Sequence, residues 1–337
     1  MDKEAHENLR DVSLIKVDSV VLGNSEPLFG KFVEQFRIND GGDIWMFAER
    51  NQNRVFAFDN QGQFIKVVGE RGKGPKGLMH VSGFDFNDED QITIYDAAQR
   101  MIKIFDLNGE LITSNTVFSE GKYWAHPYTL TSFGDRLLLP ITESEFIHEP
   151  QKSKLLAVLT YDGRIDTVFG MHDEFTLKDN SYSAENTVLV DSNYIYTSSV
   201  GSPYIQMYSR ETLQRVDYFG EYTKSFSIPE KEVHANLPIS EINKRSSGSS
   251  VMAGIYGTEQ FIVLHMQILT SEFFETIDFS KKENILILYD RETKEFIKEI
   301  PVSHTLAAAH NDKLYLIEDF NPDNYTIGIY ELSMKEK

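Results

Sequence analysis

The chain has 337 residues, of which 41% are hydrophobic and 12% aromatic, and its formal net charge is −19. This length and composition allow either two ordinary domains or one large closed β architecture, and the acidic charge disfavours binding to nucleic acid or anionic lipid. The absence of cysteine excludes disulfides, cysteine-ligated zinc, iron–sulfur clusters and cysteine nucleophiles.

Residues 1–12 begin the chain with a polar segment that lacks the pattern of a signal peptide. We expect it to be a flexible tail, and a polar start of this kind is also compatible with the trimmed end of an exported precursor. No stretch of the sequence approaches the roughly 18 apolar residues that a membrane-spanning helix requires. The sequence therefore predicts no membrane span.

A hairpin pattern recurs six times after this tail, each time as an apolar strand, a tight Asn/Asp/Gly turn and a second strand. The hairpins occupy residues 36–47, 84–96, 128–140, 187–197, 252–264 and 305–317. Another strand pair follows five of them, at residues 53–69, 100–115, 154–170, 203–220 and 284–300. Each unit is therefore predicted to be a four-stranded antiparallel meander, repeated at intervals of roughly 45–67 residues.

The two ends of the chain supply the parts of one further blade. The sixth unit has a third strand at 325–332, after which the chain ends, while 13–23 alternates like an outer strand and belongs to no complete unit. Pairing of these two segments would close a ring. We predict an all-β, six-bladed β-propeller that forms a single domain over 13–337. Two β-sandwiches are the alternative, but they would require neither the period nor an unpaired terminal strand.

The glycine-rich run GERGKGPKG lies between the first and second units, at residues 69–77. It is not a P-loop, because Lys76 is followed by Gly77 and Leu78 rather than by Ser or Thr, and no helical pattern comes after it. We interpret it as a crossover between blades, in which glycines supply the turns. Arg71, Lys73 and Lys76 could also make it a local cationic patch for an anionic ligand or an acidic partner.

Residues 69–112 resemble the NHL repeat, through Ile94-Tyr95-Asp96 and through Ile102-Lys103-Ile104-Phe105-Asp106 with Gly109. The segment Arg54–Asp59 with Gly62 matches the same pattern one blade earlier. The whole chain is also similar to TolB-like six-bladed propellers and to the uncharacterised six-bladed propellers that Bacteroidetes export as lipoproteins. This resemblance implies a binding protein of the periplasm or cell surface, with a lipid anchor in the full-length precursor, although this chain has no lipid-attachment cysteine.

Propellers usually bind ligands at the axis or on the face formed by crossovers and by loops between second and third strands. On this face we expect a ligand-binding set with cationic, aromatic and histidine members: Arg54, Arg71, Lys73, Arg100, Tyr123, Trp124 and His126. His126 is the leading single candidate, although an ordinary packed or solvated histidine is the simpler interpretation.

Two insertions stand out by length, at about 221–250 and 266–283. The first has apolar residues at helical spacing after Pro229, which indicates a cap packed on the ring or a lid. The second contains Phe273, Phe274 and Phe279 beside acidic residues, so these rings either bury against the first insertion or form a surface for a protein partner.

No dedicated metal motif is present, because the nine histidines include no His-x-x-x-His spacing. His80, His265, His304 and His310 lie near expected blade edges, so a metal centre built from several blades stays open. The inner strands have few acidic or amide side chains near their starts: Glu34, Asp85, Glu185 and Asn186. Glu49, Asp96 and Asp319 lie in loops and could lean inward.

Two functions follow from these patterns. The first is a non-catalytic propeller of the NHL type, which binds a protein, a small molecule or a glycan and needs no cofactor. The second is a calcium-dependent hydrolase or lyase, like the gluconolactonase-like and amidating-lyase propellers, in which Glu, Asp and Asn oxygens hold the cation at the axis. The lack of a Gly-x-Ser-x-Gly elbow and the few inner-strand acids favour the first.

Overall fold

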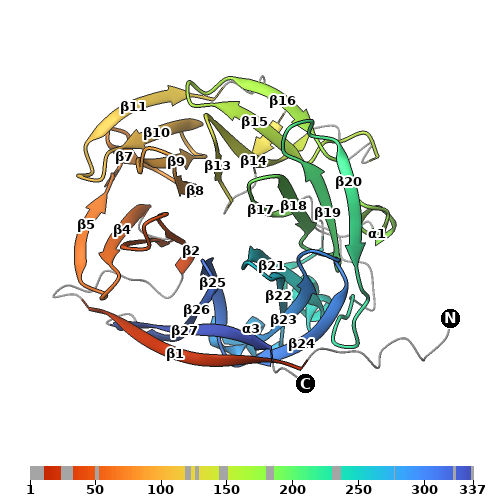
Figure 1. Cartoon of the computed structure of the whole chain (residues 1–337). Helices are drawn as coiled ribbons and strands as arrows, with labels where there is room; N and C mark the ends of the chain where they lie inside the picture. Colours follow the sequence, from red (N-terminus) through yellow and green to blue (C-terminus); the bar gives the residue numbers. More distant parts are fainter. Residues whose placement is uncertain are drawn as a thin grey trace.

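The computed structural model of the chain describes residues 11–23, 33–49, 53–117, 123–125, 129–143, 151–179, 186–229, 237–276, 278–321 and 324–334. In these residues six antiparallel sheets surround a central axis as the blades of a propeller (Figure 1). The predicted all-β, six-bladed architecture is confirmed.

Each blade runs from an inner strand at the axis to an outer strand at the rim. Blade 1 consists of β2 (Val33–Ile38), β3 (Ile44–Glu49), β4 (Arg54–Asp59) and β5 (Phe64–Val68). Blade 2 consists of β8 (Val81–Phe86), β9 (Ile92–Asp96), β10 (Met101–Phe105) and β11 (Leu111–Thr116). Blade 3 has its inner position shared by β12 (Tyr123–Ala125) and β13 (Thr131–Phe133), followed by β14 (Arg136–Glu143), β15 (Leu156–Thr160) and β16 (Ile165–Phe169).

The second half of the ring repeats this plan. Blade 4 consists of β17 (Asn186–Val190), β18 (Tyr194–Ser199), β19 (Tyr204–Ser209) and β20 (Arg215–Gly220). Blade 5 consists of β21 (Ser250–Gly257), β22 (Phe261–Ile268), β23 (Glu283–Asp290) and β24 (Phe296–Val302). Blade 6 consists of β25 (Thr305–His310), β26 (Lys313–Asn321), β27 (Asn324–Met334) and, from the other end of the chain, β1 (Val12–Gly23).

The strand β1 closes the ring as predicted. It pairs antiparallel with β27 from Val12 opposite Met334 to Gly23 opposite Asn324, and the two strands lie side by side at the rim (Figure 1). The strand also reaches both neighbouring blades, because Lys298 of β24 donates to the Val12 carbonyl at 2.9 Å and the Gly23 amide donates to the Gly62 carbonyl at 3.2 Å. One terminal strand therefore joins blades 5, 6 and 1.

The interface between blade 6 and blade 1 is packed with aromatic rings. Phe36 stacks on Phe47 with ring centroids 4.2 Å apart. Tyr315 of blade 6 meets the edges of Trp45 and Phe36 at 5.5 Å and 6.0 Å. Trp45, Phe36 and Phe47 are each at most 2% exposed. Edge-to-face and offset ring contacts add to the hydrophobic gain from burial, so aromatic packing reinforces this interface.

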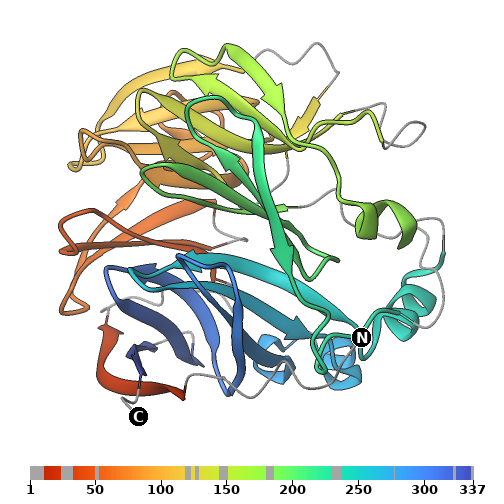
Figure 2. The same ribbon diagram turned by 45° about the vertical axis from the view of Figure 1, so that its right-hand side comes forward.

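In the part of the chain that the structure describes, helices occur only in the connections between strands. They are α1 (Glu174–Asp179), α2 (Ile239–Ser246), α3 (Ser271–Thr276) and the 3₁₀ turn η2 (Phe279–Lys281). They lie together on one face of the ring, beside blades 4 and 5 (Figure 2). Because β22 extends to Ile268 and β23 begins at Glu283, the second insertion is shorter than the sequence indicated. None of the helices in the described segments is long and apolar enough to cross a membrane.

Candidate functional site

The glycine-rich crossover is folded around a buried lysine. Lys103, in the middle of β10, is 1% exposed, and its Nζ donates to the carbonyls of Gly74, Pro75 and Gly77. The short strands β6 (Glu70–Arg71) and β7 (Gly77–Leu78) pair in parallel and hold the loop closed. The loop therefore directs carbonyl oxygens at an internal cation, which is the opposite of a phosphate-binding loop, where amide groups converge on an anion.

Asp96 fixes the end of the same crossover. Its carboxylate accepts hydrogen bonds from the amides of Met79, His80 and Gln99 and from the Gln99 side chain, at 2.6–3.2 Å. Four hydrogen bonds occupy both carboxylate oxygens, so Asp96 holds the backbone rather than leaning inward as a free ligand.

The predicted cationic residues have different surroundings. Lys76 is paired with Glu110 on blade 2, with Nζ and Oε2 2.6 Å apart, while Arg71 and Lys73 are exposed. Arg54 opens β4, and its Nε atom is buried with no hydrogen-bond partner among the described residues. Arg100 is exposed in a left-handed turn with φ of 53°.

The turns that carry the two loop arginines differ in register. In blade 1 the left-handed residue is Asn53, which directly precedes Arg54. In blade 2 it is Arg100 itself, and Met101 takes the pairing position that Arg54 has in blade 1. The two arginines are therefore not at equivalent positions.

The start of the third blade is a strand, whereas the sequence placed its residues on the loop face. Tyr123 and Trp124 lie in strand β12, and their backbones pair with Glu143 and Thr142 of β14. Their side chains, and the whole of His126, lie outside the described residues. The segment 123–125 is therefore part of the sheet rather than a crossover loop, and its role in ligand binding stays a prediction.

The two insertions meet through their helices. α2 lies beside α3, where Phe273 and Phe274 are half-buried with ring centroids 5.2 Å apart. The Nζ atom of Lys282 lies 4.6 Å from the centroid of the Phe273 ring and donates to Gln267 at 3.1 Å. Burial lowers the pKa of this lysine to about 8. Phe273 thus packs over a lysine. The side chain of Phe279 lies outside the described residues. That these rings form a surface for a protein partner stays a prediction.

One histidine proposed for a blade edge is in the interior instead. His265 in the middle of β22 is fully buried, and its Nε2 lies 2.9 Å from Oδ1 of Asn284. Burial lowers the pKa of His265 to about 4, so the ring is neutral at physiological pH. His304 and His310 do lie at the two ends of β25.

The acidic candidates for a cation site are separated or already bonded. Asn186 accepts a hydrogen bond from the Ser199 hydroxyl at 3.0 Å, and Asp319 is exposed. Glu185 and the side chains of Glu34 and Glu49 lie outside the described residues. Among the residues that the structure describes, no three His, Asp or Glu side chains gather in a way that could hold a metal ion.

Four of the inner strands share a β-bulge near their beginning. The extra residue is Glu34 in β2, Ser82 in β8, Ala253 in β21 and Ala307 in β25. Bulges redirect the side chains that follow them, and they are common beside functional sites. The third residue after each bulge is Arg37, Asp85, Tyr256 and His310. These four polar side chains therefore come from equivalent positions around the axis.

Side chains of the inner strands bond to the inner strand of the next blade. Gln35 donates to the Ser82 carbonyl at 3.1 Å and accepts from the Phe84 amide at 3.0 Å. Tyr256 donates to the Leu306 carbonyl at 3.2 Å. An inner strand has no partner strand on its axial edge, so its backbone groups need other partners. Polar side chains from the preceding blade supply them.

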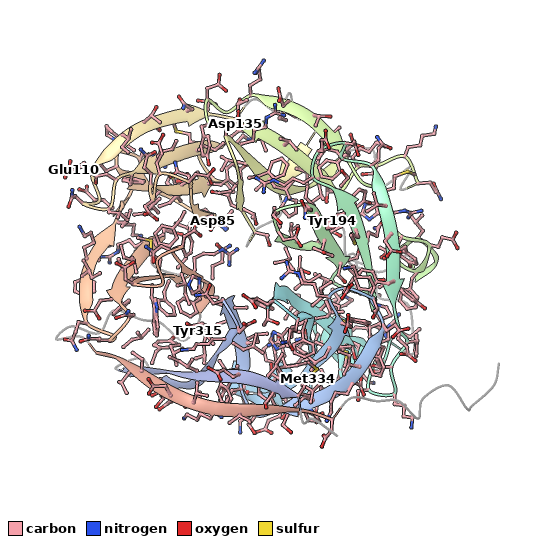
Figure 3. All side chains as sticks on the ribbon, in the orientation of Figure 1. Asp85, Glu110, Asp135, Tyr194, Tyr315 and Met334 are labelled. Atoms are coloured by element: carbon pink, nitrogen blue, oxygen red, sulfur yellow. The ribbon has the colours of Figure 1, made fainter. Side chains whose placement is uncertain are left out.

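Arg37 and Asp85 form a partly exposed charged pair at the axis. The Nε of Arg37 lies 3.7 Å from Oδ1 of Asp85, and their side chains are 26% and 18% exposed. Asp85 also accepts from the amides of Ser132, at 2.7 Å, and Phe86, at 3.0 Å. Asp85 lies toward the centre of the ring, whereas Glu110 lies at the rim (Figure 3).

Burial dominates the electrostatics of this pair. Burial raises the pKa of Asp85 to about 6, against the opposing effects of Arg37 and the two amide donors. Burial also raises the pKa of Tyr256 to about 12, and Arg37 again opposes the rise. A carboxylate with a raised pKa beside a partly exposed arginine is typical of functional sites. The axial group of Arg37, Asp85 and Tyr256, here called the axial cluster, is therefore the candidate site.

The comparisons with known proteins agree with this fold. Residues 14–223 match the family model DUF5128, described as a 6-bladed beta-propeller, and the match covers more than half of the chain. The chain belongs to the DUF5128 family. A search of the curated proteins finds no match for the DUF5128 chain.

Two crystal structures from Bacteroides resemble the DUF5128 propeller. A member of the DUF4221 family from Bacteroides vulgatus has a TM-score of 0.71 at 13% identity, with 97% of this chain and 100% of that chain covered. A protein from Bacteroides fragilis described as a putative exported protein has a TM-score of 0.61 at 14% identity, with 98% of each chain covered. At these identities the likeness shows the fold alone.

Two members of the axial cluster escaped the sequence reasoning. Asp85 was named there only as an inner-strand acid, and Arg37 and Tyr256 were not named. The signal that could identify them is their position in the repeat. When the inner strands of the DUF5128 repeats are aligned on their bulges, Arg37, Asp85 and Tyr256 occupy the same position. The bulges that set this position are a property of strand pairing and are not visible in a hydrophobic pattern.

The raised pKa of Asp85 predicts how stability changes with pH. An unfolded aspartate has a pKa of about 3.9, so between about pH 4 and 6 the folded DUF5128 chain keeps a proton that the unfolded chain loses. The contribution of Asp85 to the free energy of unfolding should therefore fall as pH rises through this window, by up to about 3 kcal/mol. Arg37, Asp40 and Tyr161 are the other charged or titratable groups around it.

The measurement is chemical unfolding of the wild type and of Asp85→Asn between about pH 4 and 7. Subtracting the two curves cancels the opposite trend from His265, whose depressed pKa makes stability fall as pH falls. The difference should decline with rising pH and become flat above about pH 7. Parallel curves would show that Asp85 is not desolvated in the folded protein.

Proposed function

We propose that this DUF5128 propeller is a non-catalytic binding protein of the cell envelope, which takes a ligand at its axis and uses the loop face for a partner. The observation that carries the proposal is the axial cluster. Arg37 and Asp85 come from equivalent positions on neighbouring inner strands and remain partly exposed, while their strand neighbours Phe36, Phe84 and Phe86 are buried. Partly exposed charge at the axis of a buried framework is what a binding site requires.

The location in the envelope is part of the same proposal. It is supported by the Bacteroides fragilis relative, which is described as a putative exported protein, and by the resemblance to exported lipoprotein propellers. The NHL-like arrangement of blades fits a protein whose loops and axis bind rather than catalyse.

The calcium-dependent alternative has less support. A calcium site uses six to eight oxygen ligands, yet both oxygens of Asp96 and of Asp85 already accept backbone hydrogen bonds. Using them for a cation would release the crossover and the joint between blades 2 and 3. Calcium binding is therefore tested in the same experiment as ligand binding.

A thermal-unfolding panel tests the proposed function. The probes are benzoate, benzylamine, glucose and calcium chloride, applied to the wild type and to an Arg37→Gln/Asp85→Asn variant. We expect at least one organic probe to raise the wild-type Tm by about 2 °C or more, because a ligand that binds only the folded state stabilises it, and to leave the variant unchanged. Calcium should give no shift.

Two outcomes would contradict the proposal. A rise in Tm with calcium that EDTA reverses would favour the hydrolase or lyase. Equal responses of the wild type and the variant to every probe would show that ligands do not bind at the axial cluster.

A further inference from the structure

The inner strand of blade 6 is unlike the others, because its central side chains are all methyl groups. Ala307, Ala308 and Ala309 follow one another in β25, and Ala307 and Ala309 are half-buried. The blades on either side of β25 provide larger polar side chains, Tyr256 from blade 5 and Arg37 from blade 1. The axis therefore has small residues on blade 6 between a phenol and a guanidinium.

Tyr256 and Arg37 belong to β21 and β2, the two inner strands that contact β25. The Tyr256 hydroxyl crosses to blade 6 and donates to the Leu306 carbonyl at 3.2 Å. The charge of Arg37 also opposes the rise in the pKa of Tyr256. The two side chains thus come from the blades on either side of β25.

Most hydrogen-bond donors of Arg37 are unused in the described part of the chain. Its NH1 atom donates to the Phe36 carbonyl at 3.1 Å, and its Nε lies 3.7 Å from Asp85. The second distance is too long for a hydrogen bond. A guanidinium has five N–H donors in a planar fork, so this one can still bind a carboxylate through two parallel bonds.

The surrounding charges select the kind of anion. Asp85 stands beside Arg37, and Asp40 adds a negative charge near Asp85 and His310. One guanidinium can balance one negative charge, whereas a phosphate with a charge of about −1.5 to −2 would add repulsion from both carboxylates. Ala307, Ala309 and the ring of Tyr256 pack in part against the cores between blades, and the part of their surface that stays accessible is apolar surface for the body of the ligand.

We propose that Arg37, with Tyr256 beside it, binds the carboxylate of a small monocarboxylate at the axis, over the alanines of β25. This inference rests on the proposed function and names the ligand class for the axial cluster. Asp85 competes with the ligand for Arg37 and so limits its affinity. Tyr256 is a contact for the apolar body of the ligand.

The test is a ligand-observed NMR titration with benzoate, and with benzamide as a neutral molecule of the same shape. Benzoate should bind the wild type at least about tenfold more tightly than benzamide, because only the anion can pair with the guanidinium. Arg37→Gln should weaken benzoate binding by about tenfold, whereas Arg164→Gln, which changes an exposed arginine in the turn between β15 and β16, should leave it unchanged. Asp85→Asn should bind benzoate about threefold or more tightly, because the competing charge is gone.

Equal binding of benzoate and benzamide to the wild type would overturn the inference, as would equal effects of Arg37→Gln and Arg164→Gln. If Arg37→Gln does not fold, the comparison of benzoate with benzamide and the Asp85→Asn variant still test the inference. Inorganic phosphate serves as a second probe, and binding tighter than benzoate would also overturn it. If benzoate does not bind, but benzylamine or glucose raises the Tm of the wild type and not that of the Arg37→Gln/Asp85→Asn variant, this inference is wrong and the proposed function stands.

Discussion

Replacing Lys103 by methionine is expected to lower the free energy of unfolding by about 2–4 kcal/mol. The substitution keeps most of the side-chain volume but removes the Lys103 donor from the carbonyls of Gly74, Pro75 and Gly77. The Gly74 carbonyl keeps a hydrogen bond from the Gly77 amide at 2.8 Å, and the buried Gly77 carbonyl keeps one from the Gln99 side chain at 2.9 Å. A hydrogen bond to a charged donor contributes about 1.5–3 kcal/mol, while exposed carbonyls recover part of the loss from water. Burial lowers the pKa of Lys103, so losing that desolvated charge offsets part of the cost.

Lys103→Met should loosen the crossover locally as well as lower the free energy of unfolding of the whole protein. The crossover between blades 1 and 2 contains three trypsin sites, at Arg71, Lys73 and Lys76, and they should be cleaved faster once the loop is released. The matched control is Lys73→Met, which removes an exposed lysine from the same loop and should change stability by no more than about 0.5 kcal/mol. Equal stability and equal cleavage of the two variants would show that the loop does not depend on Lys103.

The buried lysine also shows why part of the site could not be predicted. In the sequence Lys103 alternates with Ile102 and Ile104, a pattern that normally indicates a solvent-facing position on a half-buried strand. The structure instead places the preceding crossover over that face, so the lysine becomes an internal donor. Period-two reasoning identifies which residues share a face, but it cannot show that a connection 26–29 residues earlier in the chain covers that face.

The architecture was predictable for the opposite reason. Apart from the pairs β1–β27 and β12–β14, the strands that pair within a blade follow one another in the chain, and tight turns such as Asn39–Asp43 and Asn87–Gln91 are encoded by side chains that bond the nearby backbone. The closing strand was predictable because it lacked a partner in any unit, and its register with β27 confirms the pairing. The axial cluster depends instead on bulges and on three different blades, and such information lies in no single segment.

Replacing Gly62 by alanine is expected to lower the free energy of unfolding by about 3–5 kcal/mol. Gly62 lies in the turn between β4 and β5 with φ of 83°, and a Cβ there would stand 2.2 Å from the Val21 carbonyl of β1. The left-handed conformation alone costs an alanine about 1–2 kcal/mol. The remainder must come from pushing β1 away from blade 1, which would also strain the hydrogen bond from Gly23 to Gly62.

Two equivalent glycines separate the conformational cost from the contact. Gly109 has nearly the same φ, 74°, but its Cβ would stand 3.6 Å from the Val67 carbonyl, an ordinary contact, so Gly109→Ala should cost only about 1–2 kcal/mol. Gly163, with φ of 87°, would place a Cβ 2.5 Å from the Thr116 carbonyl and should cost nearly as much as Gly62. Chemical unfolding of the three variants gives the comparison. If the closing strand packs on blade 1 as ordinary outer strands pack on the next blade, Gly62→Ala and Gly163→Ala will be similar. A cost for Gly62→Ala no greater than for Gly109→Ala would mean that the end of β1 does not hold the ring closed.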